Sequence, residues 1–333
     1  MKRRERIRAI IAGTPADRCG FWVGHPDGVT WPLLHHAFGT ANAQEFRQKI
    51  GDDFAGLSSQ WFPDFYEGGV FLIKKTSDCD PGPLATCESV ADVARGYVWP
   101  DASKCRFDSC LATLRQAGDV YRASGVWGHF FHNLIDLFGL EDYLVKMHTA
   151  PDVVLAATER VCNFYLEANE RFYALAGDEV DACFIGNDLG TQHGLMCSPE
   201  MYERFIFPWF KKFADQAKRH GKQMILHSCG AVHPLIPRFI ELGVDCLHPL
   251  QALAKDMDAQ TLARDFKGRI AFMGGVDTQE LLVHGSPDDV RRDVRRLKAT
   301  LGPRYIVSPS HETLLSNVPP ENVRAMAEEA QKD

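Results

Sequence analysis

The stretch Met224-Ile225-Leu226-His227-Ser228-Cys229-Gly230 joins a short apolar run to a polar end that closes on a glycine. A short β-prone run bounded by a glycine is typical of a buried strand. Residues that can bind metal or catalyse, placed directly after such a strand, are typical of the C-terminal end of a parallel α/β barrel, where active sites lie. This arrangement recurs along the chain, and it decides the predicted fold.

Seven further β-prone runs alternate with longer amphipathic stretches. Such alternation indicates βα units, in which helices connect parallel strands. Eight units predict a closed (β/α)8 barrel (a TIM barrel) in a single domain spanning residues 1–333. The predicted strands are Gly20–Gly24, Asp53–Leu57, Val126–Phe131, Ala182–Gly186, Met224–Leu226, Cys246–Leu247, Ile270–Met273 and Tyr305–Val307.

Three of the intervening helices carry clear start signals. Pro199–Lys218 and Pro287–Leu301 each follow a serine, Ser198 and Ser286, that can cap the helix. Proline suits the first turn of a helix because its missing N–H would have no partner there. The same logic predicts a helix over Pro234–Leu242.

The segment Phe62–Lys104 does not fit a plain βα unit, because it contains Gly68-Gly69, Pro81-Gly82-Pro83 and Trp99-Pro100. We expect an inserted hairpin followed by a long excursion that partly covers the C-terminal end of the barrel, the barrel mouth. Long irregular segments in compact enzymes are often lids or binding loops. The alternative is a surface elaboration without function.

Composition excludes several function classes. A net charge of −7 disfavours nucleic-acid binding, which needs a basic face, and Lys2–Arg6 is interpreted as a solvent-exposed helix face. No stretch approaches the ~20 apolar residues that span a membrane, and the N-terminus lacks an apolar signal core. We therefore expect a cytoplasmic protein. Its ten cysteines are irregularly spaced, which favours small buried residues over disulfides.

A single residue separates His227 from Cys229. On a strand, side chains at positions i and i+2 point to the same side, about 6.5 Å from each other. An imidazole and a thiolate are ligands that Zn²⁺ prefers, and a catalytic zinc takes three protein ligands and keeps one position open. The third ligand must come from another strand end, where His311, Cys246 and His248 are candidates. We favour His311, because Cys246 lies inside its predicted strand. The alternative is a pair that binds no metal.

A series of short motifs that contain glycine and polar residues extends from about Gly125 to the C-terminus. They are Asn187–Gln192, Ser198–Glu200, His227–Gly230, Gly243–Asp245 with Pro249–Gln251, Gly274–Asp277, Pro309–His311 and Val318–Asn322. In order and spacing they resemble the uroporphyrinogen decarboxylase superfamily, and especially its methyltransferases. The resemblance is looser at Pro83-Leu84 and Trp99–Asp101.

The resemblance implies one of two activities. True uroporphyrinogen decarboxylases use neither metal nor cofactor, and an arginine-rich segment near their N-terminus binds the substrate's propionates. Here Gly20–Asp27 has no arginine and contains an acid, which disfavours a tetrapyrrole substrate. The methyltransferases hold zinc through His-x-Cys and a later residue, usually cysteine. His227 and Cys229 match, whereas Ser308–Glu312 has no cysteine and offers His311 in its place.

Two mechanisms follow from the resemblance. In one, zinc activates a thiol acceptor that attacks methylcobalamin on a partner protein. In the other, zinc or a nearby acid polarises a methyl ether, and the reduced corrinoid of the partner takes the methyl group. We favour the second, because Pro309–His311 and Val318–Asn322 look more like the O-demethylase type. The corrinoid has to arrive on a partner protein, because one barrel uses the whole chain.

The polar residues at the strand ends supply the remaining candidates. Asn187, Asp188 and Asp277 are the predicted catalytic residues, although a helix cap or a structural hydrogen bond is the alternative role for Asp188. The predicted substrate-binding residues are His25, His129, Gln192, His248 and Gln251. A cofactor-free decarboxylase and a non-catalytic binding protein remain alternative functions. The resemblance also implies a possible homodimer.

Overall fold

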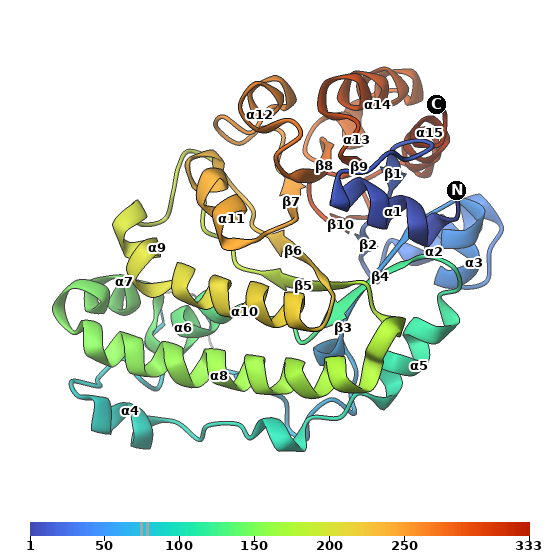
Figure 1. The fold of residues 1–333 in the computed structure, drawn as a ribbon. Helices are drawn as coiled ribbons and strands as arrows, with labels where there is room; N and C mark the ends of the chain where they lie inside the picture. Colours follow the sequence, from blue (N-terminus) through green and yellow to red (C-terminus); the bar gives the residue numbers. More distant parts are fainter. Residues whose placement is uncertain (74–75, 78–79) are drawn as a thin grey trace.

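The computed structural model describes residues 1–333 except 74, 75, 78 and 79. The chain is a (β/α)8 barrel: eight parallel strands form one sheet in the order β1-β9-β8-β7-β6-β5-β4-β3, and the helices surround it (Figure 1). The strands are β1 Gly20–Phe21, β3 Phe54–Ser58, β4 Tyr121–Gly125, β5 Ala182–Gly186, β6 Gln223–His227, β7 Cys246–Leu250, β8 Ala271–Val276 and β9 Tyr305–Pro309. A small parallel sheet pairs β2 His25–Pro26 with β10 Thr313–Leu314.

The helices of the described chain vary widely in length, and the longest, α8, runs along one side of the barrel (Figure 1). They are α1 Arg3–Ala12, α2 Trp31–Phe38, α3 Ala43–Lys49, α4 Val90–Gly96, α5 Asp108–Gln116, α6 Phe130–Phe138, α7 Leu140–Thr149, α8 Pro151–Ala176, α9 Pro199–Phe205, α10 Phe207–Arg219, α11 Ile236–Leu242, α12 Ala259–Phe266, α13 Leu281–His284, α14 Pro287–Leu301 and α15 Pro320–Ala330.

Most predicted strands and helices are confirmed. Ala182–Gly186 is β5 with the predicted bounds, and Pro287–Leu301 is α14, where the Ser286 hydroxyl accepts a hydrogen bond from the Asp289 N–H. The helix predicted over Pro199–Lys218 is divided into α9 and α10, and Pro208 lies in the first turn of α10.

The strand predicted over Val126–Phe131 was wrong. The strand is β4, Tyr121–Gly125, and Phe130 begins helix α6. The apolar residues Phe130, Phe131, Leu134 and Ile135 recur at helical spacing, whereas β4 contains Arg122 and Ser124 and looks too polar for a strand. Arg122 fits because its long side chain turns outward to the Gly118 carbonyl.

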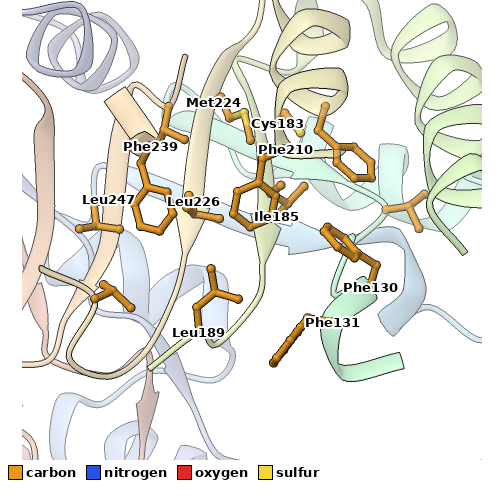
Figure 2. Close-up of a cluster of buried hydrophobic side chains, with 14 of the residues drawn as sticks. Phe130, Phe131, Cys183, Ile185, Leu189, Phe210, Met224, Leu226, Phe239 and Leu247 are labelled. Carbon is orange, nitrogen blue, oxygen red and sulfur yellow. The ribbon is translucent and has the colours of Figure 1, made fainter. Parts of the chain in front are cut away.

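Two hydrophobic clusters hold the barrel together. The inner one fills the barrel with side chains such as Phe54, Tyr121 and Ile225. The outer one lies between strands and helices, where Leu226 and Leu247 face Phe239 of α11 (Figure 2). Burying one large apolar side chain contributes about 1.5–3 kcal/mol, so these layers fix the strand ends in place.

Helix α1 contacts several barrel strands, and Ile7, Ile10 and Ile11 belong to the inner cluster. The interpretation of Lys2–Arg6 as a solvent-exposed face holds only in part, because Lys2 and Glu5 are exposed whereas Arg6 is buried. Arg4 forms an ion pair with the buried carboxylate of Asp181, at 2.9 Å. The basic residues serve the structure, because they neutralise acids that lie next to the N-terminal ends of strands.

The barrel is closed between β1 and β3 by the side chain of Asp53 as well as by backbone. The Asp53 N–H donates to the Phe21 carbonyl at 2.9 Å, and the Asp53 carboxylate accepts from the Phe21 N–H at 3.0 Å. The same buried carboxylate pairs with Arg6 and Arg18, each at 2.8 Å. A charged cluster therefore completes the ring where strand pairing is short.

The described part of Phe62–Lys104 contains α4 and a short 3₁₀ helix but no strand, so the predicted hairpin was wrong there. The N–H of Leu84 donates to the Leu137 carbonyl at the end of α6, at 2.8 Å. Helix α4 packs against α8, as Figure 1 shows. The predicted role of this segment as a lid stays a prediction.

In the described part of the chain, no helix is both long and apolar enough to cross a bilayer. The cysteines described there are all free, as the irregular spacing predicted, and most of them are buried. Cys229 is one of the partly exposed ones.

Candidate metal centre at the barrel mouth

His227 is the last residue of β6, and Cys229 follows it on the same side, as the i, i+2 spacing predicted. Cys229 Sγ lies 3.4 Å from His227 Nε2. The turn after Cys229 requires a glycine: Gly230 has a φ of +90°, and a Cβ there would lie 2.3 Å from the backbone of Gly190. The sequence thus brings the pair together and then turns the chain sharply away.

Asp188, which comes after β5, joins this pair. Its Oδ1 lies 3.2 Å from His227 Nε2 and accepts a hydrogen bond of 2.9 Å from the Cys229 N–H. Burial opposes ionisation of Asp188, but hydrogen bonds from His132 and His227 outweigh it and hold the pKa of the carboxyl well below its usual range. Asp188 is therefore a carboxylate at neutral pH.

The donor set of Asp188, His227 and Cys229 suits zinc. The three ligand atoms lie within 4.8 Å of one another. With zinc bonds of about 2.0 Å to nitrogen or oxygen and about 2.3 Å to sulfur, tetrahedral angles place nitrogen about 3.5 Å from sulfur and about 3.3 Å from oxygen. The separations of 3.4 and 3.2 Å are close to both values.

The other ring nitrogen of His227 faces a second pair of side chains. His227 Nδ1 lies 3.2 Å from His248 Nδ1 and 3.5 Å from Glu312 Oε2. Burial opposes protonation of His227, but the charges of Glu312 and Cys229 and the bond to Asp188 outweigh it and raise its pKa. Glu312 was missed in the sequence, although it directly follows His311.

His311 lies beside the pair, as predicted from its place after the last strand. Its ring stands perpendicular to that of His227, with centroids 6.3 Å apart. A hydrogen bond to Cys229 raises the pKa of His311 against the opposing effect of burial. His311 Nδ1 accepts from the Thr313 N–H at 3.1 Å, so Nε2 is the ring nitrogen that remains for Cys229 or a metal ion.

Asn187 and Asp277, predicted as catalytic, have their polar atoms engaged by backbone. Asn187 accepts from the Phe131 N–H at 2.8 Å and donates to the Gly128 carbonyl at 2.9 Å. The Asp277 carboxylate accepts from the N–H groups of Gln279, Glu280 and Leu281, at the start of α13. These bonds hold loops of the mouth in place, and a catalytic role for either residue stays a prediction.

The predicted substrate-binding residues divide into two groups, of which one lies against the metal centre. Gln251 Oε1 accepts from the Gly230 N–H at 2.7 Å, next to Cys229. His248 is fully buried behind His227, so it supports that ring and presents no surface to the mouth.

The others are held by ring packing or by hydrogen bonds to backbone. His25 is packed between Trp22 and Trp61, and burial, with the charges of Arg47 and His227, lowers its pKa to about 3. His129 is bonded to the Trp127 carbonyl, and burial lowers its pKa to about 4. The Gln192 carbonyl accepts from the Lys255 N–H, which ties its loop to the loop after β7.

The comparisons with known proteins agree with this architecture. A model of the uroporphyrinogen decarboxylase (URO-D) family matches residues 111–332, about two thirds of the chain. The chain belongs to the URO-D family. The matched region contains Asp188, His227, Cys229, His311 and Glu312, so the whole candidate metal centre lies within the family domain.

The fold of this URO-D family member is similar to that of a solved methyltransferase from Methanosarcina mazei. The two chains share 16% sequence identity with a TM-score of 0.67, and the alignment covers 99% of this chain and 98% of the other. No curated protein matches the sequence. At this identity the structural likeness establishes the barrel architecture.

Proposed function

We propose that this protein is a zinc-dependent methyltransferase that moves a methyl group between a small O-methyl or similar donor and the corrinoid of a partner protein. The observation that carries the proposal is the set of imidazole, thiol and carboxylate atoms at the mouth, with separations that suit tetrahedral zinc. His227 Nε2 and Cys229 Sγ would hold the ion. Asp188 and His311 are the two candidates for third ligand.

Bound zinc would supply a Lewis acid to the oxygen of the methylated donor. The surrounding residues orient the ligands: His248 and Glu312 engage the far nitrogen of His227, and the Cys229 N–H binds Asp188. Such supporting bonds fix the tautomer and direction of a ligand. They make the donor set rigid before substrate arrives.

Demethylation also needs a proton source. Were a methyl group transferred from an ether to a reduced corrinoid, the ether oxygen would have to gain one proton. We propose that His311 delivers it, because its pKa is raised above the ordinary value and its ring lies beside that of His227. If His311 is the third ligand, it cannot fill this role.

The corrinoid partner is supported by the resemblance of Pro309–His311 and Val318–Asn322 to O-demethylase-type methyltransferases. The shared fold with a methyltransferase is in keeping with it. We propose that the partner docks at the barrel mouth, because the methyl group has to reach its corrinoid from there.

Family membership alone also fits a cofactor-free decarboxylase. Against it, Gly20–Asp27 contains no arginine, and the nearby Arg47 is engaged with Asp52 and the Gly24 carbonyl. A polyanionic tetrapyrrole would therefore find little free positive charge there. The third possibility, a binding protein without catalysis, predicts ligand binding without turnover.

The test is zinc analysis of the purified protein together with methyl transfer from a panel of methyl ethers to free reduced cobalamin, followed by its absorbance. We expect near-stoichiometric zinc, and we expect Cys229→Ser to lower zinc content and transfer together. Cys19→Ser is the matched control, since Cys19 is also partly exposed but lies outside the metal centre. Full activity without zinc, or carbon dioxide release that survives chelation, would overturn the proposal.

A further inference from the structure

The ring of His227 has two nitrogen atoms, and the metal centre proposed at the mouth uses Nε2. The other nitrogen, Nδ1, faces a second group of donor atoms, which we call the inner donor set: His227 Nδ1, His248 Nδ1 and Glu312 Oε2. His227 Nδ1 lies 3.2 Å from His248 Nδ1 and 3.5 Å from Glu312 Oε2. Each of the three residues has a ligand atom within 4.8 Å of those of the other two.

The positions of the two imidazole rings suit a shared ion. Two imidazoles that direct Nδ1 at one zinc ion, with bonds of about 2.0 Å at a tetrahedral angle, have nitrogens about 3.3 Å apart and ring centroids about 5.2 Å apart. A straight N–H···N hydrogen bond with nitrogens 3.2 Å apart would place the centroids about 5.6 Å apart. The centroids of His227 and His248 are 5.1 Å apart. The rings therefore match a common ion more closely than a straight hydrogen bond.

The inner donor set has more acceptor atoms than hydrogens to satisfy them. Glu312 Oε2 is buried and has no hydrogen-bond partner among the described residues. His311 Nδ1 lies 3.7 Å from it but already accepts from the Thr313 N–H, so it does not donate to the carboxylate. Two neutral imidazoles that meet through Nδ1 share one hydrogen at most. An ion would engage all three acceptors, whereas that hydrogen leaves buried acceptors unpaired, which is costly.

The donor types name the class of ion. Two imidazoles and one glutamate hold the catalytic zinc of several enzymes, and two histidines with a carboxylate also hold Fe²⁺. A hard ion such as Mg²⁺ or Ca²⁺ prefers oxygen ligands and would gain little from two nitrogens. His248 is fully buried, whereas Glu312 is partly exposed, so an ion would enter from the side of Glu312.

We propose that the inner donor set is a second metal site, which binds a divalent transition-metal ion such as Zn²⁺. A neutral imidazole has one nitrogen lone pair to offer, so His227 binds one ion at a time and the two sites are alternatives. With an ion at Nδ1, His227 Nε2 carries the hydrogen and donates it to Asp188 Oδ1, 3.2 Å away. The inference goes beyond the proposed function, because it requires neither methyl transfer nor a corrinoid.

The test titrates Co²⁺, a spectroscopic substitute for zinc, into the metal-free full chain under reducing conditions. A thiolate bound to Co²⁺ produces a charge-transfer band in the near ultraviolet, so this band marks the site that contains Cys229. The parent protein should bind one Co²⁺ and show the band. Cys229→Ser should still bind one Co²⁺, more weakly and without the band, because the ion then occupies the inner donor set.

Two double variants of equal charge show which residues hold that ion. Adding Glu312→Gln to Cys229→Ser should lower Co²⁺ affinity at least about tenfold further, whereas adding Asp188→Asn should change it less than about threefold. Asparagine keeps an oxygen that accepts from His227 Nε2, so it preserves the support of the ring. Circular dichroism checks the fold of each variant.

Loss of Co²⁺ binding in folded Cys229→Ser protein would overturn the inference. So would equal effects of the two added substitutions, or a larger effect of Asp188→Asn. The proposed function is judged separately, by zinc content and methyl transfer of the parent protein. Methyl transfer with no cobalt bound by Cys229→Ser would leave the function standing and remove the second site.

Discussion

The Nδ1 atoms of His227 and His248 lie 3.2 Å apart. Only one of the two can carry the hydrogen of a neutral pair. If His227 Nδ1 donates, then His227 Nε2 presents its lone pair toward Cys229 and Asp188, as a metal ligand must. His248 then carries its own hydrogen on Nε2, which is buried without a hydrogen-bond partner. This tautomer of His227 suits zinc binding, but it leaves a buried N–H of His248 without a hydrogen-bond partner.

We therefore expect His248→Phe to weaken zinc binding about 10- to 100-fold, which is typical for loss of such a supporting group. His248 itself would not touch the metal, so the effect must pass through the orientation of His227. Competition with a chelator measures the affinity, and thermal unfolding of the metal-free protein reports the fold. His36→Phe, on the exposed side of α2, is the control. Unchanged zinc affinity in a folded His248→Phe protein would contradict the tautomer argument.

The third ligand can be assigned by comparing Asp188→Asn with His311→Gln. Of these two residues, Asp188 is the one whose ligand atom lies within 4.8 Å of those of both His227 and Cys229. We expect Asp188→Asn to lower zinc affinity nearly as much as Cys229→Ser, and His311→Gln to lower it less. The reverse order would support His311, the ligand favoured by the sequence.

The strand ends were predictable because the apolar runs are short and end in glycine or polar residues. Those signals placed His227, Cys229 and His311 together, since parallel strands bring their C-terminal ends to one face. Hydrogen-bond partners were not predictable. Asn187 and Asp277 are residues of types that often act in catalysis. In the fold, however, Asn187 accepts a hydrogen bond from the distant Phe131 N–H, and Asp277 accepts one from the nearby Glu280 N–H.

β4 was misplaced for a physical reason as well. Arg122 lies near the N-terminal end of β4. The strand can include it because the guanidinium reaches past the strand to the Gly118 carbonyl and solvent. The more apolar Phe130–Phe138 then looks like the better strand, although it is the amphipathic helix that follows. Glu312 was overlooked because the neighbouring His311 had already been assigned as the third zinc ligand.

Closure of the barrel at Asp53 predicts a large effect on stability. Asp53→Ala would leave Arg6 and Arg18 without their buried partner, and breaking one side of a buried charged cluster costs about 3–5 kcal/mol. Urea unfolding followed by circular dichroism measures this change. The exposed pair of Arg106 and Asp108 is the control, since Asp108→Ala should cost less than about 1 kcal/mol. Equal effects of the two substitutions would mean that Asp53 does not hold β1 against β3.

Burial keeps His129 neutral, and a chain of hydrogen bonds behind the mouth fixes its tautomer. The Tyr165 hydroxyl donates to Asn133 Oδ1 at 2.6 Å, and Asn133 Nδ2 lies 3.3 Å from His129 Nε2. His129 Nδ1 lies 2.8 Å from the Trp127 carbonyl. The ring therefore donates from Nδ1 and accepts at Nε2. A second proton on Nε2 would face the Asn133 amide donor, and burial also lowers the pKa of His129 to about 4.

This arrangement predicts a loss of stability in mild acid. The unfolded chain takes up a proton at His129 near pH 6.5, whereas the folded protein resists it until about pH 4. Between these values the unfolded state binds more protons, so the free energy of unfolding falls as pH falls, by about 3 kcal/mol from this residue. His129→Gln should flatten the dependence in that window, because glutamine can both donate and accept without titrating. His193→Gln, at an exposed histidine, should leave the dependence unchanged. Urea unfolding of the three proteins at pH values across the window decides it, and parallel curves for His129→Gln and the parent protein would show that His129 is not the group responsible.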